Sequence, residues 1–316
     1  MPEVSVIVPT HNRRALLLLT LRSILLQSDV DLELIVVDDG SIDGTGTAVE
    51  QLADSRARVV RNEVAQGVSA ARDRGRAETT GDWIAFCDDD DLWAPTKLRS
   101  QLRAAEATRR DWAYVGVVNV DHNLRIVSGR PPPDPGEAVR ELPHRNVIPG
   151  GGSNVIVRSE LLKKMPPFDP RLKNTEDWEM WIRLANVGPP ACDSRPLIAY
   201  RIHSGNASLD TKAILQGIKI IEQIHDTTAD MGTIHRWLAE SCLRTGHRLK
   251  GAKHLGLAAL NGQYRGVAGD VRDILARKIP LLEGRHLRAI PSEVARWREQ
   301  SAPWLGSLRS LTRDDV

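Results

Sequence analysis

The amino-acid sequence predicts an α/β protein in which a mostly parallel β-sheet flanked by helices is followed by an α-helical C-terminal region. In the first third of the chain, short apolar runs alternate with amphipathic segments. That order builds a parallel sheet with helices packed on its faces. From residue 213 onward this alternation gives way to helical periodicity. We therefore expect a Rossmann-like domain over residues 1–209 and a helical domain over residues 210–316.

The alternation before residue 90 predicts four strands and three helices. The strands are apolar runs ended by polar or turn-forming residues, namely Val4–Val8, Leu32–Val37, Arg58–Arg61 and Trp83–Cys87. The helices are Arg14–Gln27, Thr45–Leu52 and Gly67–Thr80. Polar clusters follow three of the strands, at Thr10–Arg13, Asp38–Ser41 and Asp88–Asp91. Because ligands bind beyond the carboxyl ends of parallel strands, we expect a ligand site where these clusters meet.

The later segments are less regular. Two further helices are predicted at Pro95–Arg109 and Glu176–Asn186, and three strands at Trp112–Val120, Asn154–Val157 and Leu197–Arg201. Ser128–Pro143 is predicted to be a loop, because its clustered prolines cannot donate to a ladder or continue a helix. Trp237–Thr245 and Gly251–Leu260 resemble a tetratricopeptide-like helical hairpin, although no repeat of about 34 residues is present. Two interpretations fit the tail Val294–Leu311, which either lies on a membrane surface or caps the helical domain.

Composition narrows the class of protein. The formal net charge is only +2 and the basic residues are dispersed, so we expect no nucleic-acid partner. Cys87, Cys192 and Cys242 are far apart and odd in number, which is typical of reduced thiols in a cytoplasmic protein. Met1–Asn12 shows no leader pattern, and no apolar run reaches the ~20 residues that span a bilayer. We therefore expect a cytoplasmic protein, and peripheral attachment to the inner face of the membrane stays open.

The four consecutive aspartates Asp88–Asp91 are the strongest chemical signal. Their carboxylates repel one another strongly unless they are solvated or bound to a cation. Mg²⁺ or Mn²⁺ prefers oxygen ligands, commonly one or two carboxylates together with substrate phosphates. The alternative is a solvated acidic turn that caps the helix starting near Pro95. The preceding apolar strand and the following Leu92-Trp93 favour the metal site.

Four other residues have both a functional and a structural interpretation. Asp39 can accept a hydrogen bond from a base or ribose, or it can cap a turn. Asp177 begins a helix, where its carboxylate is either a general base or a partner of the helix dipole. Trp178 can stack on a sugar or pack in the core. His203 can bind a metal or a diphosphate, or it can be a structural or merely exposed residue of its loop.

Six segments together resemble the inverting family 2 glycosyltransferases of the GT-A fold. They are VSVIVPTHNR at 4–13, ELIVVDDGSIDGT at 33–45, GVSAARDRG at 67–75, GDWIAFCDDDDLW at 81–93, TEDWEMWIRL at 175–184 and YRIHSGNAS at 200–208. Six motifs in the family's order are highly specific, and they cover roughly residues 1–209. The resemblance implies an enzyme of the hexosyltransferase type. Such an enzyme moves a sugar from a nucleotide-diphosphate sugar, most commonly a UDP-sugar, to an acceptor hydroxyl.

The resemblance also implies a role for each matching residue on the donor side. The residues that would line the nucleotide pocket are Pro9, Thr10, Asn12 and Arg13. Asp39 would accept a hydrogen bond from the base, and Arg72 would approach the nucleotide. Asp88 and Asp89 would face the ribose and the donor sugar. Trp178 is a further donor-side candidate because of its residue type and not because of the resemblance.

The remaining implied roles concern the metal and the chemistry. Asp90 would bind Mg²⁺ or Mn²⁺ together with His203, and the metal would neutralise the leaving diphosphate. Asp177 would remove the proton from the acceptor hydroxyl during a single in-line displacement, which inverts the anomeric configuration. Two departures stand out: Asp73 occupies a position where the family often has Asn, and four adjacent aspartates make the metal register ambiguous by one position.

Two alternatives remain. A nucleotidyltransferase would also have strand-end carboxylates, but its phosphate loop would be glycine-rich, unlike PTHNR here. A catalytically silent nucleotide-sugar-binding or assembly protein would lack the base, whereas Asp177 is present. The sequence leaves dTDP and GDP open beside UDP. The acceptor is a glycan, a lipid-linked glycan, a protein or a small molecule, and a homodimer through the helical domain is also plausible.

Overall fold

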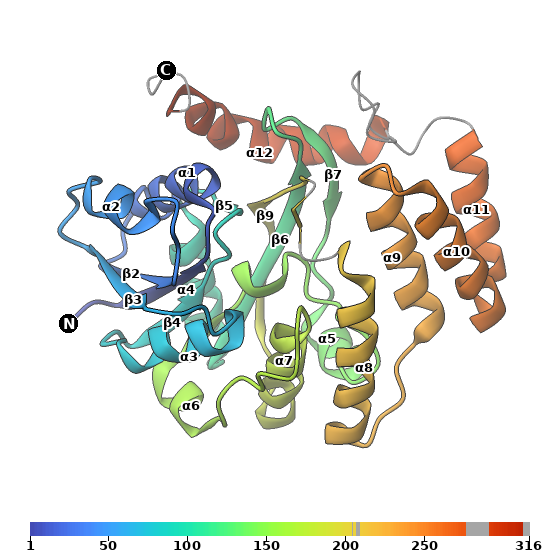
Figure 1. Ribbon diagram of the computed structural model, residues 1–316, viewed down its shortest axis with the longest axis horizontal. Helices are drawn as coiled ribbons and strands as arrows, with labels where there is room; N and C mark the ends of the chain where they lie inside the picture. Colours follow the sequence, from blue (N-terminus) through green and yellow to red (C-terminus); the bar gives the residue numbers. More distant parts are fainter. Residues whose placement is uncertain (204, 207–208, 276–290, 312–316) are drawn as a thin grey trace.

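The computed structural model describes residues 1–203, 205–206, 209–275 and 291–311. A nine-stranded sheet forms its centre, in the order β3-β2-β1-β4-β8-β6-β9-β5 with β7 beside β6 (Figure 1). The strands are β1 (Val4–Thr10), β2 (Leu32–Asp39), β3 (Ala57–Asn62), β4 (Trp83–Phe86), β5 (Leu92–Trp93), β6 (Trp112–Val120), β7 (Ile126–Arg130), β8 (Ile156–Arg158) and β9 (Ala191–Arg201). The helices are α1 (Arg14–Leu25), α2 (Thr45–Glu50), α3 (Val68–Ala77), α4 (Lys97–Thr108), α5 (Pro135–Glu141), α6 (Ser159–Lys164), α7 (Glu176–Val187), α8 (Thr211–His225), α9 (Met231–Arg244), α10 (Arg248–Ala258), α11 (Tyr264–Leu275) and α12 (Pro291–Leu311).

The first four strands of the sheet order form its parallel half. β1 pairs in parallel with β2 and β4, and β2 pairs in parallel with β3. Every residue of β1 is buried, because a central parallel strand is covered by helices on both faces. Beyond β4 the sheet becomes mixed, since β8 runs antiparallel to both β4 and β6. The predicted α/β class with a helical C-terminal region is confirmed.

The proline-rich segment differs from its prediction as a loop. Its first residues, 128–130, are the end of β7, which pairs antiparallel with β6, and Pro135–Glu141 forms α5. Asp134 caps this helix by accepting a hydrogen bond from the Gly136 amide at 2.9 Å. Pro135 occupies the first helical position, where a missing N–H costs nothing and the fixed φ suits the helix. The prediction failed because proline is unfavourable inside a helix but favourable where a helix begins.

Apolar side chains fill both sides of the sheet. One cluster includes Leu21 of α1, Leu98 of α4 and Trp304 of α12. The other includes Ala71 of α3, Trp181 of α7 and Ile218 of α8. The two layers hold the strand ends rigidly, so loops that follow the strands can present polar groups in fixed positions.

The C-terminal tail packs against the sheet. Trp297, Trp304, Leu305 and Leu308 of α12 are all at most 9% exposed and lie in the first core cluster. α12 contacts β7 and β9 rather than the hairpin of α9 and α10 (Figure 1). Its apolar face is therefore occupied. Within the described part of the chain, no helix is both long and apolar enough to cross a membrane.

Two histidines are buried where α9 packs on α10. His235 is 6% and His254 is 5% exposed, and their Nδ1 atoms lie 3.1 Å apart. One Nδ1 must therefore donate and the other accept, which requires at least one neutral ring. Burial lowers the pKa of His235, and burial together with the neighbouring charges of His235, Lys253 and Lys250 lowers the pKa of His254.

We expect this pair to make the fold less stable in mild acid. A histidine whose pKa is lower in the folded than in the unfolded chain stabilises the fold fully above its unfolded pKa of about 6.5. That stability is lost as the pH falls below this value. In urea unfolding between pH 8 and pH 5, His254→Gln should lose less stability than the wild type. The exposed His122 provides the control, since His122→Gln should follow the wild type. Identical profiles for the three proteins would contradict this expectation.

Candidate active site

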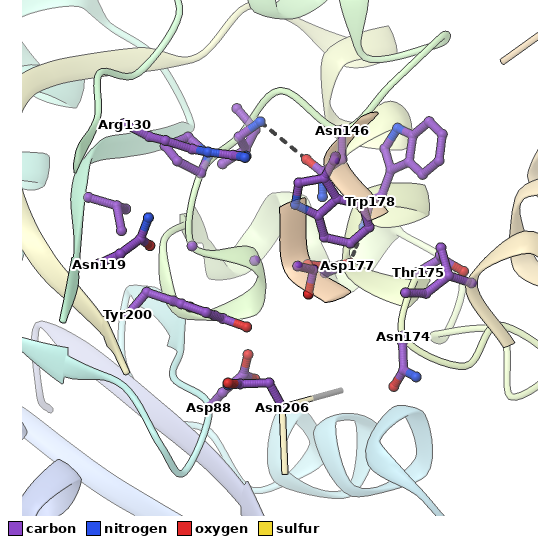
Figure 2. Close-up of a pocket in the computed structure, with 18 of the residues that line it drawn as sticks. Asp88, Asn119, Arg130, Asn146, Asn174, Thr175, Asp177, Trp178, Tyr200 and Asn206 are labelled. Atoms are coloured by element: carbon purple, nitrogen blue, oxygen red, sulfur yellow. Dashed lines mark hydrogen bonds between the residues drawn. The ribbon is translucent and has the colours of Figure 1, made fainter. Parts of the chain in front are cut away.

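A cavity of about 1240 Å³ runs from the carboxyl ends of β1, β2 and β4 to α9. Thr10, Asp39 and Asp88 line it at the three strand ends, and Trp237 lines it on α9. The three polar clusters noted in the sequence thus border one space. Figure 2 shows the part of this cavity that lies around Asp88 and Asp177.

The aspartate run after β4 divides into pocket-facing and inward-facing carboxylates. Asp91 is fully buried and accepts a hydrogen bond from the Ser153 hydroxyl at 2.5 Å. The same hydroxyl accepts from the Asp88 amide at 2.9 Å, so Asp91 helps to fix the turn. Asp88, Asp89 and Asp90 line the cavity instead. This arrangement shows which three of the four carboxylates face the cavity.

A cationic side chain bridges two of these carboxylates. Arg13 Nη1 lies 3.2 Å from Asp89 Oδ1 and 2.6 Å from Asp90 Oδ2. The Thr10 hydroxyl also donates to Asp89 Oδ2 at 2.8 Å. Burial and the charge of Asp90 raise the pKa of Asp89 to about 6, although Arg13 opposes them. The structure therefore shows that positive charge is stabilised between these two aspartates.

Asp90 and His203 are suited to hold a divalent cation. His203 Nε2 lies 3.0 Å from Asp90 Oδ2, about the separation of two neighbouring ligands that each lie about 2.1 Å from an octahedral cation. The Asn206 side chain accepts from the His203 amide at 2.6 Å and so fixes this loop. Burial alone would raise the pKa of Asp90, but the hydrogen bond to His203 and the charge of Arg13 outweigh it and lower the pKa. Asp90 is therefore held as the anion that a metal requires.

The described side chains do not form a complete metal site by themselves. Among the described residues, no group of three or more His, Cys, Asp and Glu side chains is arranged to hold a metal. Mg²⁺ is commonly bound by only one or two carboxylates, with substrate phosphates supplying further ligands. Asp90 and His203 therefore fit a cation that is bound together with a diphosphate.

Arg72 is buried and joins the two sides of the site. Its Nη2 donates to Asp88 Oδ1 at 2.7 Å, and its Nη1 donates to Glu176 Oε1 at 2.6 Å. The Arg72 side chain is about 3% and that of Glu176 about 5% exposed, so this ion pair is shielded from solvent, whereas Asp88 is about 34% exposed. Because one guanidinium binds the carboxylates of both Asp88 and Glu176, it fixes the position of Asp88 relative to the start of α7.

The glycine loop before β8 leaves no room for a side chain beside this arginine. A Cβ at Gly152 would lie 2.3 Å from Arg72 Nη2 and 3.1 Å from Asp88 Oδ1. Gly152→Ala should therefore displace Arg72 and lower kcat/KM by about 10- to 100-fold, because displacements of about 1 Å near reacting groups have effects of this size. Gly256→Ala is the control, since nothing lies within 4 Å of a Cβ there. Steady-state kinetics and thermal unfolding of both variants test this, and equal kcat/KM values would contradict it.

Asp177 lies across the glycine loop from the aspartate run (Figure 2). A Cβ at Gly151 would lie 3.1 Å from Asp177 Oδ2 and 3.9 Å from Asp88 Oδ2, so both carboxylates border the space above this glycine. Burial and the charge of Glu176 raise the pKa of Asp177 to about 7, although Arg72 opposes this shift. A carboxylate with such a pKa exchanges protons readily near neutral pH.

The loops after β1 and β2 form the other end of the cavity. The Asp39 carboxylate accepts from the amides of Gln66 and Gly67 at 2.9 and 2.8 Å. Pro9 lines the cavity beside it. Asn12 has a φ of 53° and accepts from the Ile42 amide at 2.8 Å, so its side chain ties the two loops together. Pro9, Thr10, Arg13 and Asp39 thus line one end of the site, whereas Asn12 is exposed and is not among the lining residues.

Trp178 is mainly a core residue. It is 4% exposed, and its Nε1 donates to the Leu142 carbonyl at 2.7 Å. The small part that remains accessible contributes to the cavity wall near Asp177. The structure therefore supports the packing interpretation of this tryptophan more directly than stacking on a sugar.

A comparison with known families decides which group of proteins the chain belongs to. The sequence model described as glycosyl transferase family 2 matches residues 5–165, half of the chain. The chain belongs to glycosyl transferase family 2. It is therefore an enzyme of the glycosyltransferase class, as the motifs predicted.

Individual members and solved structures agree with this assignment. The Escherichia coli protein named UDP-Glc:alpha-D-GlcNAc-diphosphoundecaprenol beta-1,3-glucosyltransferase WfaP is 27% identical over 71% of this chain and 87% of its own length. Staphylococcus aureus TarS 1–349 in complex with UDP superposes with a TM-score of 0.57 and 18% identity, over 99% of this chain and 92% of that one. Mannosyltransferase PcManGT from Pyrobaculum calidifontis, in complex with GDP-Man and Mn²⁺, gives a TM-score of 0.56 and 18% identity, over 98% and 86%. These structural likenesses confirm the GT-A fold.

Sequence reasoning missed several residues at the site of this family 2 glycosyltransferase. Glu176 was noted only with Asp177, yet it is the second partner of Arg72. Tyr200 of β9 lines the cavity, and Figure 2 shows its hydroxyl end directed toward the space near Asp88. Strand alternation could have found it, since Arg201 turns inward and donates to the Thr20 hydroxyl at 2.7 Å. Arg130 and Asn146 also line the cavity, and no sequence pattern marked them.

Proposed function

We propose that the enzyme transfers a sugar from a UDP-sugar to a hydroxyl group of a lipid-linked glycan, with inversion and with Mg²⁺ or Mn²⁺ as its cofactor. One observation carries the proposal. The pocket-facing carboxylates Asp88–Asp90 and the carboxylate Asp177, with its pKa of about 7, border one cavity on either side of Gly151. A leaving diphosphate and an attacking hydroxyl can therefore be bound on opposite sides of one reacting carbon.

The donor nucleotide is proposed to lie between the loops after β1 and β2. Asp39 would accept a hydrogen bond from the base, with Pro9, Thr10 and Arg13 beside the rest of the nucleotide. A UDP complex of TarS and a GDP-Man complex of PcManGT, both of the same fold, support this use of the site. Arg72 contributes indirectly, because its two ion pairs leave it to position Asp88 rather than to bind the nucleotide itself.

Asp90 and His203 are proposed to hold the cation. When bound there, Mg²⁺ or Mn²⁺ neutralises negative charge that develops on the leaving diphosphate. Arg13, which now pairs with Asp89 and Asp90, is close enough to contact the same phosphates. The Mn²⁺ in the PcManGT complex supports the choice of metal.

Asp177 is proposed as the general base. The acceptor hydroxyl gives its proton to a carboxylate oxygen of Asp177 while its own oxygen attacks the anomeric carbon. The bond from that carbon to the diphosphate oxygen breaks at the same time, and the diphosphate leaves with its electron pair. Attack from the face opposite the leaving group inverts the configuration. No enzyme nucleophile takes part.

The acceptor is proposed to enter from the helical side. The wall there combines apolar residues such as Ile218 and Trp237 with Arg130, which suits a substrate with both sugar and charged or apolar parts. The name of WfaP, which includes a diphosphoundecaprenol, supports a lipid-linked acceptor. We accordingly propose that residues 1–209 bind the donor and carry out catalysis, that residues 210–316 shape the acceptor side, and that the enzyme works in the cytoplasm at the inner face of the membrane.

Product analysis tests this function. The purified chain is incubated with UDP-glucose or UDP-N-acetylglucosamine, Mn²⁺ and a polyprenyl diphosphate that carries N-acetylglucosamine. We expect release of UDP and a product whose new linkage has the opposite anomeric configuration to the donor, with no release in EDTA. Retention of configuration, or full turnover in EDTA, would contradict the proposed mechanism.

A further inference from the structure

The C-terminal helices contain a basic segment without acidic residues. Between Glu240 and Asp270 the sequence has no Asp or Glu, but it has five basic side chains at Arg244, Arg248, Lys250, Lys253 and Arg265. Arg244 turns inward to Glu240, whereas the side chains of Lys250 and Lys253 are exposed on α10. The local charge is thus strongly positive, although the whole chain carries only +2.

Large apolar side chains are exposed on the same surface. Leu249 is 90% and Leu260 is 84% exposed, and Tyr264 follows at 62%. Leu249 and Lys253 of α10 are four residues apart, a spacing that places side chains on one face of a helix, and Leu260 follows in the π-helical turn Ala259–Gln263. An exposed leucine beside lysines can enter a lipid surface while the lysines contact the headgroups.

The opposite face of α10 is already used. His254, Leu255 and Ala258 are at most 9% exposed, and Leu255 lines the cavity that leads to Asp177. In Figure 1, α10 lies at the far side of the molecule from β1, β2 and β3, where the nucleotide loops are. The exposed face of α10 is therefore next to the proposed acceptor entrance and remote from the donor loops.

We propose that Leu249, Lys250 and Lys253 of α10, together with Leu260 of the π-helical turn that follows it, form a surface that docks on an anionic lipid surface. The leucines would enter the boundary between headgroups and acyl chains, and the lysines would contact lipid phosphates. The proposal rests on the proposed function in one respect only: a lipid-linked acceptor explains why the enzyme would bind a membrane. The membrane contact itself follows from the charge and exposure of α10.

Other occupants fit less well. A second copy of the chain that packed α10 on α10 would place basic residues against basic residues, since a two-fold interface brings the same patch to both sides. A nucleic acid would use the lysines but would leave Leu249 and Leu260 without a function, because backbone recognition depends on charge. An anionic membrane uses both kinds of side chain at once.

Sedimentation of the full chain with lipid vesicles, in the absence of donor and acceptor, tests the proposal. Vesicles of phosphatidylcholine alone are compared with vesicles in which about a third of the lipid is phosphatidylglycerol. We expect the wild type to bind the anionic vesicles at least about tenfold more strongly. Leu249→Ser/Leu260→Ser and Lys250→Glu/Lys253→Glu should each reduce that binding by about tenfold or more.

Matched controls separate this contact from general effects. Val187→Ser removes an apolar side chain that is 60% exposed at the end of α7, and Lys163→Glu/Lys164→Glu reverses two exposed lysines on α6. Both controls should bind as the wild type does, and UDP affinity should be unchanged in all variants. Equal binding to both kinds of vesicle, equal loss in the controls, or a dimer in light scattering that the leucine variant dissociates would overturn the proposal. Because no sugar transfer is measured, failure here leaves the proposed chemistry standing, and failure of the chemistry leaves this result standing.

Discussion

Asp177→Asn is expected to lower kcat by about 10³-fold while UDP binds as tightly as in the wild type. The substitution keeps the shape of the side chain but removes the oxygen that accepts the proton of the acceptor hydroxyl, and general bases typically contribute 10²- to 10⁴-fold. Steady-state kinetics and calorimetric binding of UDP measure the two effects separately. Near-normal turnover with intact UDP binding would show that another group is the base.

The pH dependence of the reaction provides a second readout of the same residue. In the proposed mechanism the carboxylate form of Asp177 is the active one, and burial raises the pKa of Asp177 to about 7. The wild-type kcat/KM should therefore rise with pH up to about 7 and fall about tenfold for each pH unit below it. Glu137→Gln is the control, because Glu137 lines the same cavity and has no role in the mechanism. Glu137→Gln should keep the wild-type kcat/KM and show the same fall in kcat/KM below pH 7.

Asp90→Asn is expected to weaken metal-dependent donor binding by at least about 100-fold. Without the charge of Asp90, His203 is the remaining protein ligand of the proposed pair. Changes to residues that only support a metal ligand already lower metal affinity by up to about 100-fold, so loss of a ligand should have at least this effect. Calorimetric titration of UDP in saturating Mn²⁺ measures this loss. Without metal, the affinities of the variant and the wild type should be similar.

The control for this prediction lies at the opposite end of β4 from Asp90. Asp82 is exposed at the amino end of β4, opposite the cavity, so Asp82→Asn should bind UDP and Mn²⁺ as the wild type does. An Asp90→Asn variant that kept the full effect of Mn²⁺ would place the metal site elsewhere. His203→Ala should show a similar loss to Asp90→Asn, since the two side chains contact each other.

The strands that position the site could be predicted because their pattern is local. β1 and β2 are continuous apolar runs, and such runs identify buried parallel strands without knowledge of their neighbours. β7 and α5 were missed because of the prolines around them. Proline disrupts the interior of a helix or strand but is favourable at the first position of a helix. The packing of α12 on the sheet could not be predicted, since its apolar residues indicate a buried face but not the partner that covers it.

The site itself depends on contacts between distant residues. That Asp91 faces inward follows from Ser153, which is 62 residues away, so the aspartate run alone could not define its register. Arg72 is held by Glu176 over a separation of 104 residues, so this ion pair could not be predicted from the motif that contains Arg72. The motifs predicted which residues gather at the site. How these residues are arranged relative to one another could be seen only in the tertiary structure.

Calorimetric titration of UDP into the wild-type chain, with and without Mn²⁺, tests the central claim most directly. If Asp90 and His203 hold a cation together with the diphosphate, UDP should bind at least about tenfold more tightly in the presence of Mn²⁺. Parallel titrations of dTDP and GDP should show weaker binding, because the proposed donor is a UDP-sugar. Equal UDP affinity with and without Mn²⁺ would contradict a metal-assisted site at the aspartate cluster.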